Sequence, residues 1–292
     1  MDTIDNTGMM ALTILAMVAL ICIYVFTGIS VVRNNPLFRN SVGEVSRRYE
    51  TDITPANYAF GIWNLIFLWE AAWVLFAVSS IWRTTAEGPI LMNPDVLPME
   101  FYIFWILSCV FYVGWLFLWD REYLLIAFID LLLLTLSGYA AVAFQGIATA
   151  KYADELSKKS DVDLTLIYVL VQNGTDLFYS WTTIATLLNL SSALTYDPMV
   201  KKRVNKITSG TIALAVLGVL VIGWSVCENT VFYEYFKYVY AWYGVLLWAC
   251  SGILVKNFDK TSRNSIITVI LLCVIIVCLV AKIAVYTVST FG

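Results

Sequence analysis

The sequence predicts an all-α, polytopic membrane protein with about eight transmembrane helices. Of the 292 residues, 60% are hydrophobic and only 13% are charged, whereas a soluble domain of this length needs far more charge on its surface. A helix needs about 20 consecutive apolar residues to cross a bilayer. Eight runs approach that length, at about 9–32, 57–82, 101–119, 122–144, 166–194, 210–226, 232–255 and 265–288. They take up most of the chain and leave no room for a soluble domain.

The first run is predicted to be a retained helix rather than a cleaved signal peptide. Its leader, MDTIDNTG, is acidic rather than basic, and the run is too long for the apolar segment of a signal peptide. We therefore expect the N-terminus to lie on the non-cytoplasmic side of the membrane.

The second run is predicted to start at the segment TPANY, residues 54–58. Proline is favoured in the first turn of a helix because its missing N–H would have no partner there. We expect Thr54 to cap a helix that begins at Pro55. Further along, Trp63 and Glu70 are spaced so that they share one face of the helix.

Several tryptophans lie deep inside the predicted helices. Membrane tryptophans usually form belts at the interface, but four are too far from the ends of their runs for that role alone: Trp69, Trp73, Trp105 and Trp115. In the fifth run, Trp181, Ala185 and Asn189 fall on one line of the helix. These residues either pack neighbouring helices or line an internal ligand cavity.

The last two runs carry charged residues near their ends. In the seventh run, Glu234 and Lys237 have the i, i+3 spacing of an ion pair, which we expect at the outer interface. In the eighth run, Lys282 lies within two turns of the predicted helix end. We expect its long side chain to extend to the interface and keep the ammonium group in water.

Two carboxylates lie near the middle of predicted helices. Glu70 belongs to the second run and Asp130 to the fourth. A charged side chain inside a bilayer costs roughly 2.5–3.5 kcal/mol on insertion scales, so such a group usually faces protein or water. A structural hydrogen bond between helices is the leading interpretation of both residues. The functional alternative is a pair of proton-titrating sites in a transporter.

The basic residues are divided unequally between the two sides of the predicted bundle. Twelve belong to the loops of one side, at 33–56, 120–121, 197–209 and 256–264, and five to the other. The twelve are Arg33, Arg39, Arg47, Arg48, Arg121, Lys201, Lys202, Arg203, Lys206, Lys256, Lys260 and Arg263, and the five are Arg83, Lys151, Lys158, Lys159 and Lys237. The positive-inside rule places the first set in the cytoplasm and both termini on the non-cytoplasmic side.

The absence of histidine argues against enzymatic activity. With no histidine in the chain, Ser-His-Asp and Cys-His catalysis, HExxH zinc chemistry and histidine-ligated haem are excluded. No glycine-rich nucleotide-binding motif is present, and a net charge of −3 without a basic run argues against nucleic-acid partners. The six cysteines form no CxxC pair and are expected to pack as apolar residues. We therefore expect no catalytic residues, no cofactor and no metal site.

Three separated segments resemble one family. They are TPANYAFGIWNLIFL at 54–68, YVGWLFLWDREYLLIAFIDLLLLTLS at 112–137 and LFYSWTTIATLLNLSSAL at 177–194. These are similar to the proline–aromatic start of helix two, the tryptophan-rich helix three turning into helix four, and the helix-five pattern W-x-x-x-A-T-x-x-N of the TspO/MBR family. This is the family of translocator proteins and tryptophan-rich sensory proteins, and the resemblance is closest to its longer tryptophan-rich members.

The resemblance implies a five-helix bundle over roughly residues 9–195. It divides the chain into a TspO-like membrane domain at 1–196 and a three-helix membrane extension at 197–292. Family members bind tetrapyrroles, sterols and other flat hydrophobic molecules in a pocket near the cytoplasmic side, and the basic loop 33–56 would be its lid. By position, the pocket or its support would consist of Pro55, Tyr58, Phe60, Trp63, Trp115, Trp119, Asp130, Trp181, Ala185 and Asn189.

The leading functional hypothesis is a membrane receptor or carrier for a hydrophobic, planar ligand. The first alternative is a proton-coupled secondary transporter that uses Glu70 and Asp130. The second is a non-catalytic accessory subunit whose small-residue helix faces contact partner helices. The expected partners are the lipid bilayer and a hydrophobic small molecule, and self-association into a homo-oligomer stays open.

Overall fold

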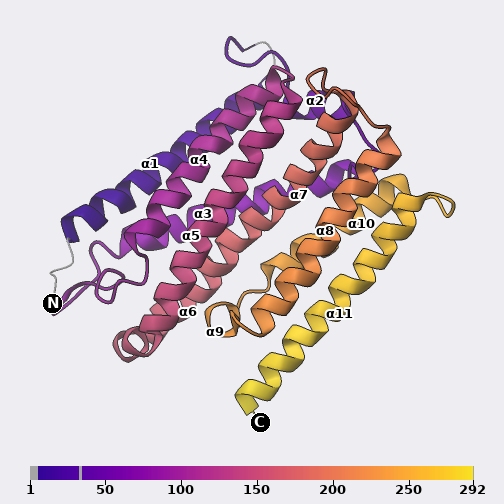
Figure 1. The fold of residues 1–292 in the computed structure, drawn as a ribbon. Helices are drawn as coiled ribbons and strands as arrows, with labels where there is room; N and C mark the ends of the chain where they lie inside the picture. The colour runs from indigo at the N-terminus through magenta and orange to yellow at the C-terminus, as the bar shows by residue number, and fades with distance from the viewer. Residues whose placement is uncertain (1–5, 33–34, 292) are drawn as a thin grey trace.

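The computed structural model describes residues 6–32 and 35–291, which form a bundle of long helices with short connections (Figure 1). Leader residues 1–5 and the predicted cytoplasmic Arg33 lie outside the described residues. The first part contains α1 (Asn6–Val31), α2 (Val42–Arg48), η1 (Asn57–Gly61), α3 (Ile62–Ser79), β1 (Thr84–Thr85), β2 (Gly88–Pro89), α4 (Met99–Asp120) and α5 (Leu124–Lys159). The second contains α6 (Asp161–Leu166), the π-helical η2 (Ile167–Gln172), α7 (Asn173–Tyr196), α8 (Lys206–Asn229), α9 (Tyr233–Phe236), α10 (Ala241–Asn257) and α11 (Arg263–Phe291).

Every predicted apolar run contains a long helix, but two runs differ from the prediction. The seventh run, 232–255, is interrupted at residues 237–240, so that the short α9 precedes α10, and the fifth run, 166–194, includes the π-helical η2 before α7. Among the described residues, six helices are long and apolar enough to cross a membrane: α1, η1 with α3, α4, α5, α8 and α11. The other two runs form α10, which has 17 residues, and the more polar α7. The all-α membrane fold is therefore confirmed, while the count of eight spans stays a prediction.

Helix α7 lies in the centre of the bundle, in contact with α3, α5, α8 and α10. Because other helices surround it, 17 of its 24 residues are buried, and it need not present apolar side chains to lipid. Its hydroxyl groups bond to neighbouring helices instead: Thr182 and Thr186 each lie 3.2 Å from the Thr135 hydroxyl of α5. This central position explains why α7 has less apolar character than the helices around it.

The close approach of α5 to α7 depends on a glycine. A Cβ atom added to Gly138 would lie 2.0 Å from ring atoms of Tyr179. No side chain larger than hydrogen fits there without displacing the tyrosine, which is itself fully buried.

The C-terminal helices pack directly on the first part of the chain. α8 and α10 contact α7, and α11 contacts α8 and α10. Helix α10 also binds η1 and the extended segment before it. The Ala56 N–H donates to the Gly252 carbonyl (2.9 Å), and the Trp248 indole donates to the Ala59 carbonyl (2.9 Å).

The predicted start of the second helix at Pro55 is wrong. Residues 54–56 are not helical, a short 3-10 helix follows, and α3 begins at Ile62. Thr54 does not cap this helix, because its hydroxyl instead accepts a hydrogen bond from the Thr51 N–H (3.0 Å). The segment can stay extended because α10 supplies the partners that its backbone would otherwise find within a helix.

The expectation that Lys282 extends to the interface is also wrong. Its side chain is buried, and the ammonium lies 2.6 Å from a Glu228 carboxylate oxygen. It also donates to the carbonyls of Phe236 (3.1 Å) and Val239. Glu228 lies just beyond the predicted sixth run and far from Lys282 in the chain, so the sequence did not indicate that it is the counter-ion. By contrast, the predicted ion pair between Glu234 and Lys237 is confirmed, at 3.0 Å.

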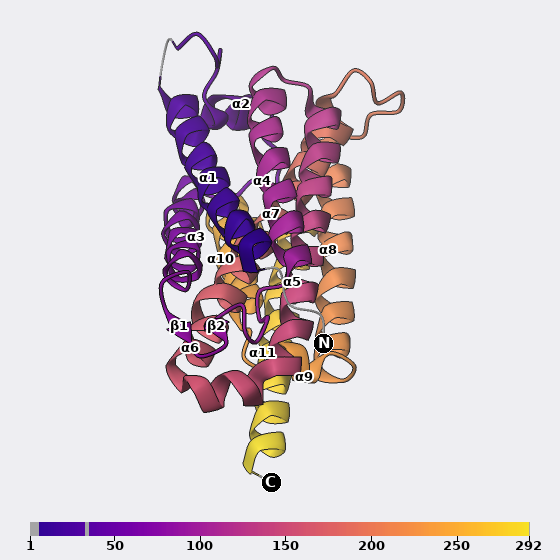
Figure 2. The ribbon, with the colours of Figure 1, turned by 90° about the vertical axis from the view of Figure 1, so that its left-hand side faces the viewer.

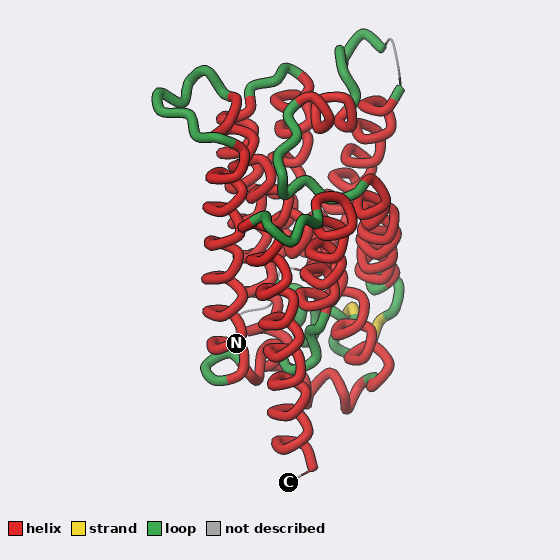
Figure 3. The backbone as a smooth tube through the Cα atoms, turned by 90° about the vertical axis from the view of Figure 1, so that its right-hand side faces the viewer, coloured by secondary structure: helices red, strands yellow, loops and turns green. Residues whose placement is uncertain are grey.

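The loops are sorted between the two ends of the bundle (Figures 2 and 3). The connections α1–α2, α4–α5, α7–α8 and α10–α11, which carry the larger basic set, lie toward the end marked by α2. The start of α1 and the end of α11 lie toward the opposite end, together with β1, β2, α6 and α9. This arrangement agrees with the predicted separation of charge. The assignment of the α2 end to the cytoplasm rests on the positive-inside rule alone.

We predict that Lys282→Met lowers the free energy of unfolding by about 3–5 kcal/mol, because it leaves the buried Glu228 carboxylate without its counter-ion. SDS titration in mixed micelles measures this. The matched control is Lys237→Met, which removes an exposed ion pair and should change stability by less than about 1 kcal/mol. Equal effects of the two substitutions would contradict a structural role for the buried pair.

A second prediction compares two glycines of α10. A Cβ atom at Gly252 would lie 2.9 Å from the Ala59 Cβ, whereas one at Gly244 meets no atom within 4 Å. We expect Gly252→Ala to destabilise the protein by about 1–3 kcal/mol through overpacking. Gly244→Ala should be neutral or stabilising by up to about 1 kcal/mol. The same SDS titration distinguishes them, and a neutral Gly252→Ala would show that the contact between α10 and η1 is loose.

Candidate functional site

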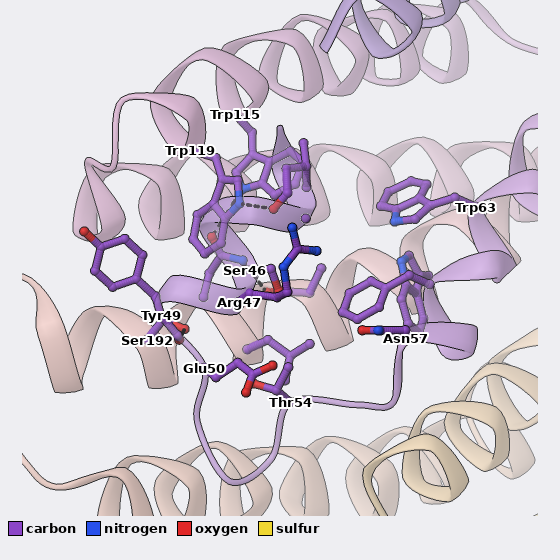
Figure 4. Close-up of a pocket in the computed structure, with 17 residues that line it drawn as sticks. Ser46, Arg47, Tyr49, Glu50, Thr54, Asn57, Trp63, Trp115, Trp119 and Ser192 are labelled. Carbon is purple, nitrogen blue, oxygen red and sulfur yellow. Dashed lines mark hydrogen bonds between the residues drawn. The ribbon is translucent and has the colours of Figure 1, made fainter. Parts of the chain in front are cut away.

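A cavity of about 290 Å³ lies under α2, between the start of α3, the end of α4 and the second half of α7 (Figure 4). Its aromatic walls come from three separate helical segments. They are Phe60, Trp63, Trp115, Trp119 and Trp181. The remaining lining residues from α7 are Ala185, Leu188, Asn189 and Ser192.

The aromatic rings form flat walls. Trp115 and Trp119 lie one turn apart on α4 and stack, with ring centroids 6.0 Å apart and planes inclined by 22°. Trp181 meets Trp63 and Phe60 edge to face, at centroid distances of 6.4 and 6.0 Å. A cavity walled by ring faces and edges suits a flat apolar molecule.

Three indole N–H groups around the cavity differ in whether they have a hydrogen-bond acceptor. Trp115 donates to the Asn189 side-chain oxygen (3.2 Å), and Trp119 donates to the Val42 carbonyl of the lid (3.2 Å). Trp181 is buried, and its Nε1–H has no acceptor among the described residues. An unpaired buried donor is costly, so the Trp181 N–H would be stabilised by any acceptor that reaches it.

Helix α2 covers the cavity and places charged groups at it. Arg47 extends from α2 into the space between Trp119 on one side and Trp63 on the other (Figure 4). Arg47 forms no ion pair with any described residue. Glu50, which also lines the cavity, pairs with Lys256 of α10. The cavity therefore combines apolar walls with one unpaired cation at its rim.

The segment before α2 is held by the end of α4. The buried Asp120 carboxylate accepts hydrogen bonds from the backbone N–H groups of Arg39 (2.7 Å) and Asn40 (2.6 Å). Helix α2 then begins with a capping box, in which the Ser41 N–H donates to the Glu44 carboxylate (2.8 Å).

The segment after α2 is held by polar contacts with α7 and the α4–α5 turn. Tyr49 donates to Glu122 (2.7 Å), and its own carbonyl accepts from the Ser192 hydroxyl (3.0 Å). Tyr196 donates to the Glu50 carbonyl (2.6 Å). The lid is thus fastened on both sides of α2 by hydrogen bonds, in addition to the packing of the buried Phe38 and Val45.

Seven of the ten residues predicted for the pocket line this cavity, namely Phe60, Trp63, Trp115, Trp119, Trp181, Ala185 and Asn189. The other three lie elsewhere. Pro55 packs against Gly252 of α10, and Tyr58 lies edge to face with Trp248 at 5.3 Å. Asp130 faces Gly114 on α4, and its Oδ2 atom has no hydrogen-bond partner among the described residues. Their binding role stays a prediction.

Several lining residues were missed in the sequence. Leu188 and Ser192 extend the line of Trp181 and Ala185 by further helical turns, so their spacing was a usable signal. Eight other lining residues come from the lid and the segment after it, where no periodicity points to the cavity. They are Val42, Gly43, Ser46, Arg47, Tyr49, Glu50, Thr54 and Asn57.

Glu70 lies outside the cavity, and its hydrogen bonds account for the deep position of two tryptophans. Its Oε2 atom accepts hydrogen bonds from Trp73 (2.7 Å) and Trp105 (3.0 Å), whose rings meet at 89°. Its other oxygen has no partner among the described residues. Trp73 and Trp105 therefore bind a buried carboxylate between α3 and α4 and do not line the cavity under α2.

These features define a helical membrane protein with a lidded, tryptophan-walled internal cavity. Its family can be stated more closely. A family model described as TSPO-like protein matches residues 12–283, and the chain belongs to the TspO/MBR family. The match extends beyond residues 9–195, the segment that carried the resemblance in the sequence, and includes α8, α10 and most of α11. Neither the curated proteins nor the solved structures include a match to this chain.

We predict that Asp120→Ala loosens the lid, because the N–H groups of Arg39 and Asn40 lose a charged acceptor. Each such bond contributes about 1.5–3 kcal/mol, so tryptic cleavage after the exposed Arg39 should accelerate at least about tenfold. Mass spectrometry of timed digests in micelles measures the rate. The control is Asp259→Ala, in an exposed loop toward the α2 end of the bundle, which should leave the cleavage rate unchanged. An unchanged rate in folded Asp120→Ala protein would mean that other contacts hold the lid.

Proposed function

We propose that this protein is a membrane receptor or carrier that binds a flat, hydrophobic molecule in the cavity under α2. The single observation that carries the proposal is a cavity walled by four tryptophans from three helices, in which one buried indole N–H has no partner. Aromatic walls with few convergent polar groups are typical of small-molecule sites. Nothing in this arrangement calls for a catalytic group, so we propose binding rather than catalysis.

The charge at the rim suggests the polar end of the ligand. Arg47 is a fixed cation without a carboxylate partner among the described residues, whereas Glu50 is neutralised by Lys256. A guanidinium group recognises carboxylates with paired hydrogen bonds. The site therefore favours a planar apolar molecule that carries a carboxylate or another acceptor at its edge. Tetrapyrroles have this character, and sterols meet the apolar part of the description.

The size of the cavity implies that the lid moves. At about 290 Å³, it lies just below the range of roughly 300–1,000 Å³ for ligand pockets. A tetrapyrrole would need more room, which displacement of α2 would provide. The hydrogen bonds of Asp120 and Glu122 to the lid would then break or rearrange during binding.

The other two functional hypotheses stay predictions. Proton-coupled transport has in its favour that Glu70 and Asp130 each keep one carboxylate oxygen without a partner among the described residues. The role of accessory subunit has no comparable observation in its favour. Ligand binding is better supported because its residues meet around one cavity.

We predict that protoporphyrin quenches the intrinsic tryptophan fluorescence of the purified protein saturably. Trp63→Leu and Trp181→Leu should each weaken the affinity at least about tenfold, since each removes a large ring contact of roughly 1.5–3 kcal/mol. Titration in micelles or nanodiscs gives the affinity, with a sterol as competitor. The control is Trp82→Leu, which removes an exposed tryptophan of the loop after α3.

The proposal fails if the quenching is not saturable, or if both cavity variants keep the affinity of the wild type. Equal losses in Trp82→Leu and the cavity variants would also contradict it, because the effect would then not depend on the cavity. A sterol that competes with protoporphyrin would support one site for both classes of ligand.

A further inference from the structure

A second cavity, of about 440 Å³, lies between α5, α7, α8, α9 and α10. None of the described residues lines both this cavity and the one under α2. The two cavities use different residues of α7: Asp176 and Thr183 line this one, and the cavity under α2 is lined by Trp181, Ala185, Leu188, Asn189 and Ser192. Because half of its wall comes from α8 to α10, this cavity exists only where the C-terminal helices pack on α5 and α7.

Half of the lining residues are aromatic. They are Tyr139, Trp224, Phe232, Tyr235, Phe236 and Trp242. Trp224 stacks on Phe232 at 6.2 Å and contacts Phe236 at 5.4 Å. A Cβ atom added to Gly146 of α5 would lie 2.9 Å from the Phe236 ring. Helix α9 is therefore packed closely on α5 and closes the cavity along one side.

The rim of the cavity faces lipid. Ile147 of α5 and Leu220 of α8 line it and are 52% and 41% exposed. Both helices are long and apolar enough to cross a membrane. An exposed apolar rim on two such helices opens toward acyl chains, so a ligand would enter from the bilayer.

Every fully buried polar atom of the wall except one has a hydrogen-bond partner among the described residues. One Asp176 oxygen accepts from the Trp242 backbone N–H (2.6 Å), and the other accepts from Ser180 (3.4 Å). The hydroxyls of Tyr139 and Thr183 lie 2.8 Å apart and bond to each other. The Trp242 side chain is only 5% exposed, and its indole N–H has no acceptor among the described residues. An indole N–H can only donate, so it needs an acceptor from outside the chain.

We propose that this cavity is a second ligand site, which takes an uncharged, ring-containing molecule from the bilayer and pairs its acceptor oxygen with the Trp242 indole N–H. The rings of the wall match an aromatic or alicyclic body. The ligand is uncharged because no basic residue of the described chain lines the cavity and its one carboxylate has both oxygens engaged. The site goes beyond the proposed function, since it shares no lining residue with the cavity under α2.

Benzophenone tests this proposal, because it is a bilayer-soluble diaryl ketone that labels its binding site on illumination. The full chain in lipid nanodiscs is labelled over a range of concentrations, digested and mapped by mass spectrometry. We expect saturable labelling on peptides from α5 and α8–α10. Diphenylmethane has the same two rings without the carbonyl. Its affinity, measured by competition with benzophenone labelling, should be about three- to tenfold lower than that of benzophenone, because it lacks one hydrogen bond.

The variant Trp242→Phe keeps an aromatic ring and removes the N–H, so benzophenone and diphenylmethane should bind it equally. The matched control, Trp181→Phe, removes the unpaired indole of the other cavity and should keep the difference between the two molecules. Because diphenylmethane is also compared on the wild type, the test does not depend on the folding of a variant.

Three outcomes would overturn the proposal. The first is labelling that does not saturate or that maps only around α2. The second is equal binding of benzophenone and diphenylmethane to the wild type. The third is tighter binding of the cationic benzhydrylamine, which would make Asp176 the determinant. Protoporphyrin titration of Trp242→Phe separates the two sites, since it should keep wild-type affinity under α2 whatever happens here.

Discussion

A polar group that this chain carries into the bilayer is costly unless it finds a partner within the protein, and the rest of the structure depends on this constraint. Helix α7 meets it by lying at the centre. Tyr179 bonds to Ser108 of α4 (2.8 Å), and Ser191 bonds to Ser209 of α8 (2.9 Å). Around it, the buried Lys282 and Glu228 neutralise each other between α8 and α11. Hydrogen bonds thus connect helices that apolar packing alone would not orient, because lipid is as apolar as the side chains.

The need to pair buried polar groups also distinguishes the two cavities from the rest of the bundle. Six of the tryptophans donate their indole N–H to an acceptor within the protein, namely Trp69, Trp73, Trp105, Trp115, Trp119 and Trp248. Among the described residues, two buried indoles lack an acceptor, Trp181 and Trp242. Each lines a different cavity. Because an unpaired buried donor is costly, these two buried indole N–H groups are best explained as hydrogen bonds kept for ligands.

Sequence reasoning succeeded where a residue's role follows from its own helix. The resemblance to the TspO/MBR family predicted most of the wall under α2, and helical spacing placed Trp181, Ala185 and Asn189 on one face of α7. It failed where the partner is distant in the chain. Thr54 and Pro55 start no helix because α10 binds that segment, and Lys282 is buried because Glu228 lies opposite it. No local pattern contains either partner.

The sequence by itself determined that the chain is a helical membrane protein of the TspO/MBR type, since apolar run length and motif spacing are local properties. The tertiary structure decided which helix is central, where the lid is fastened and which carboxylate pairs with which cation. It also created the second cavity, whose wall joins Tyr139 to Trp242 across about a hundred residues of chain. Contacts of that kind depend on how the helices pack, and packing is a property of the whole fold.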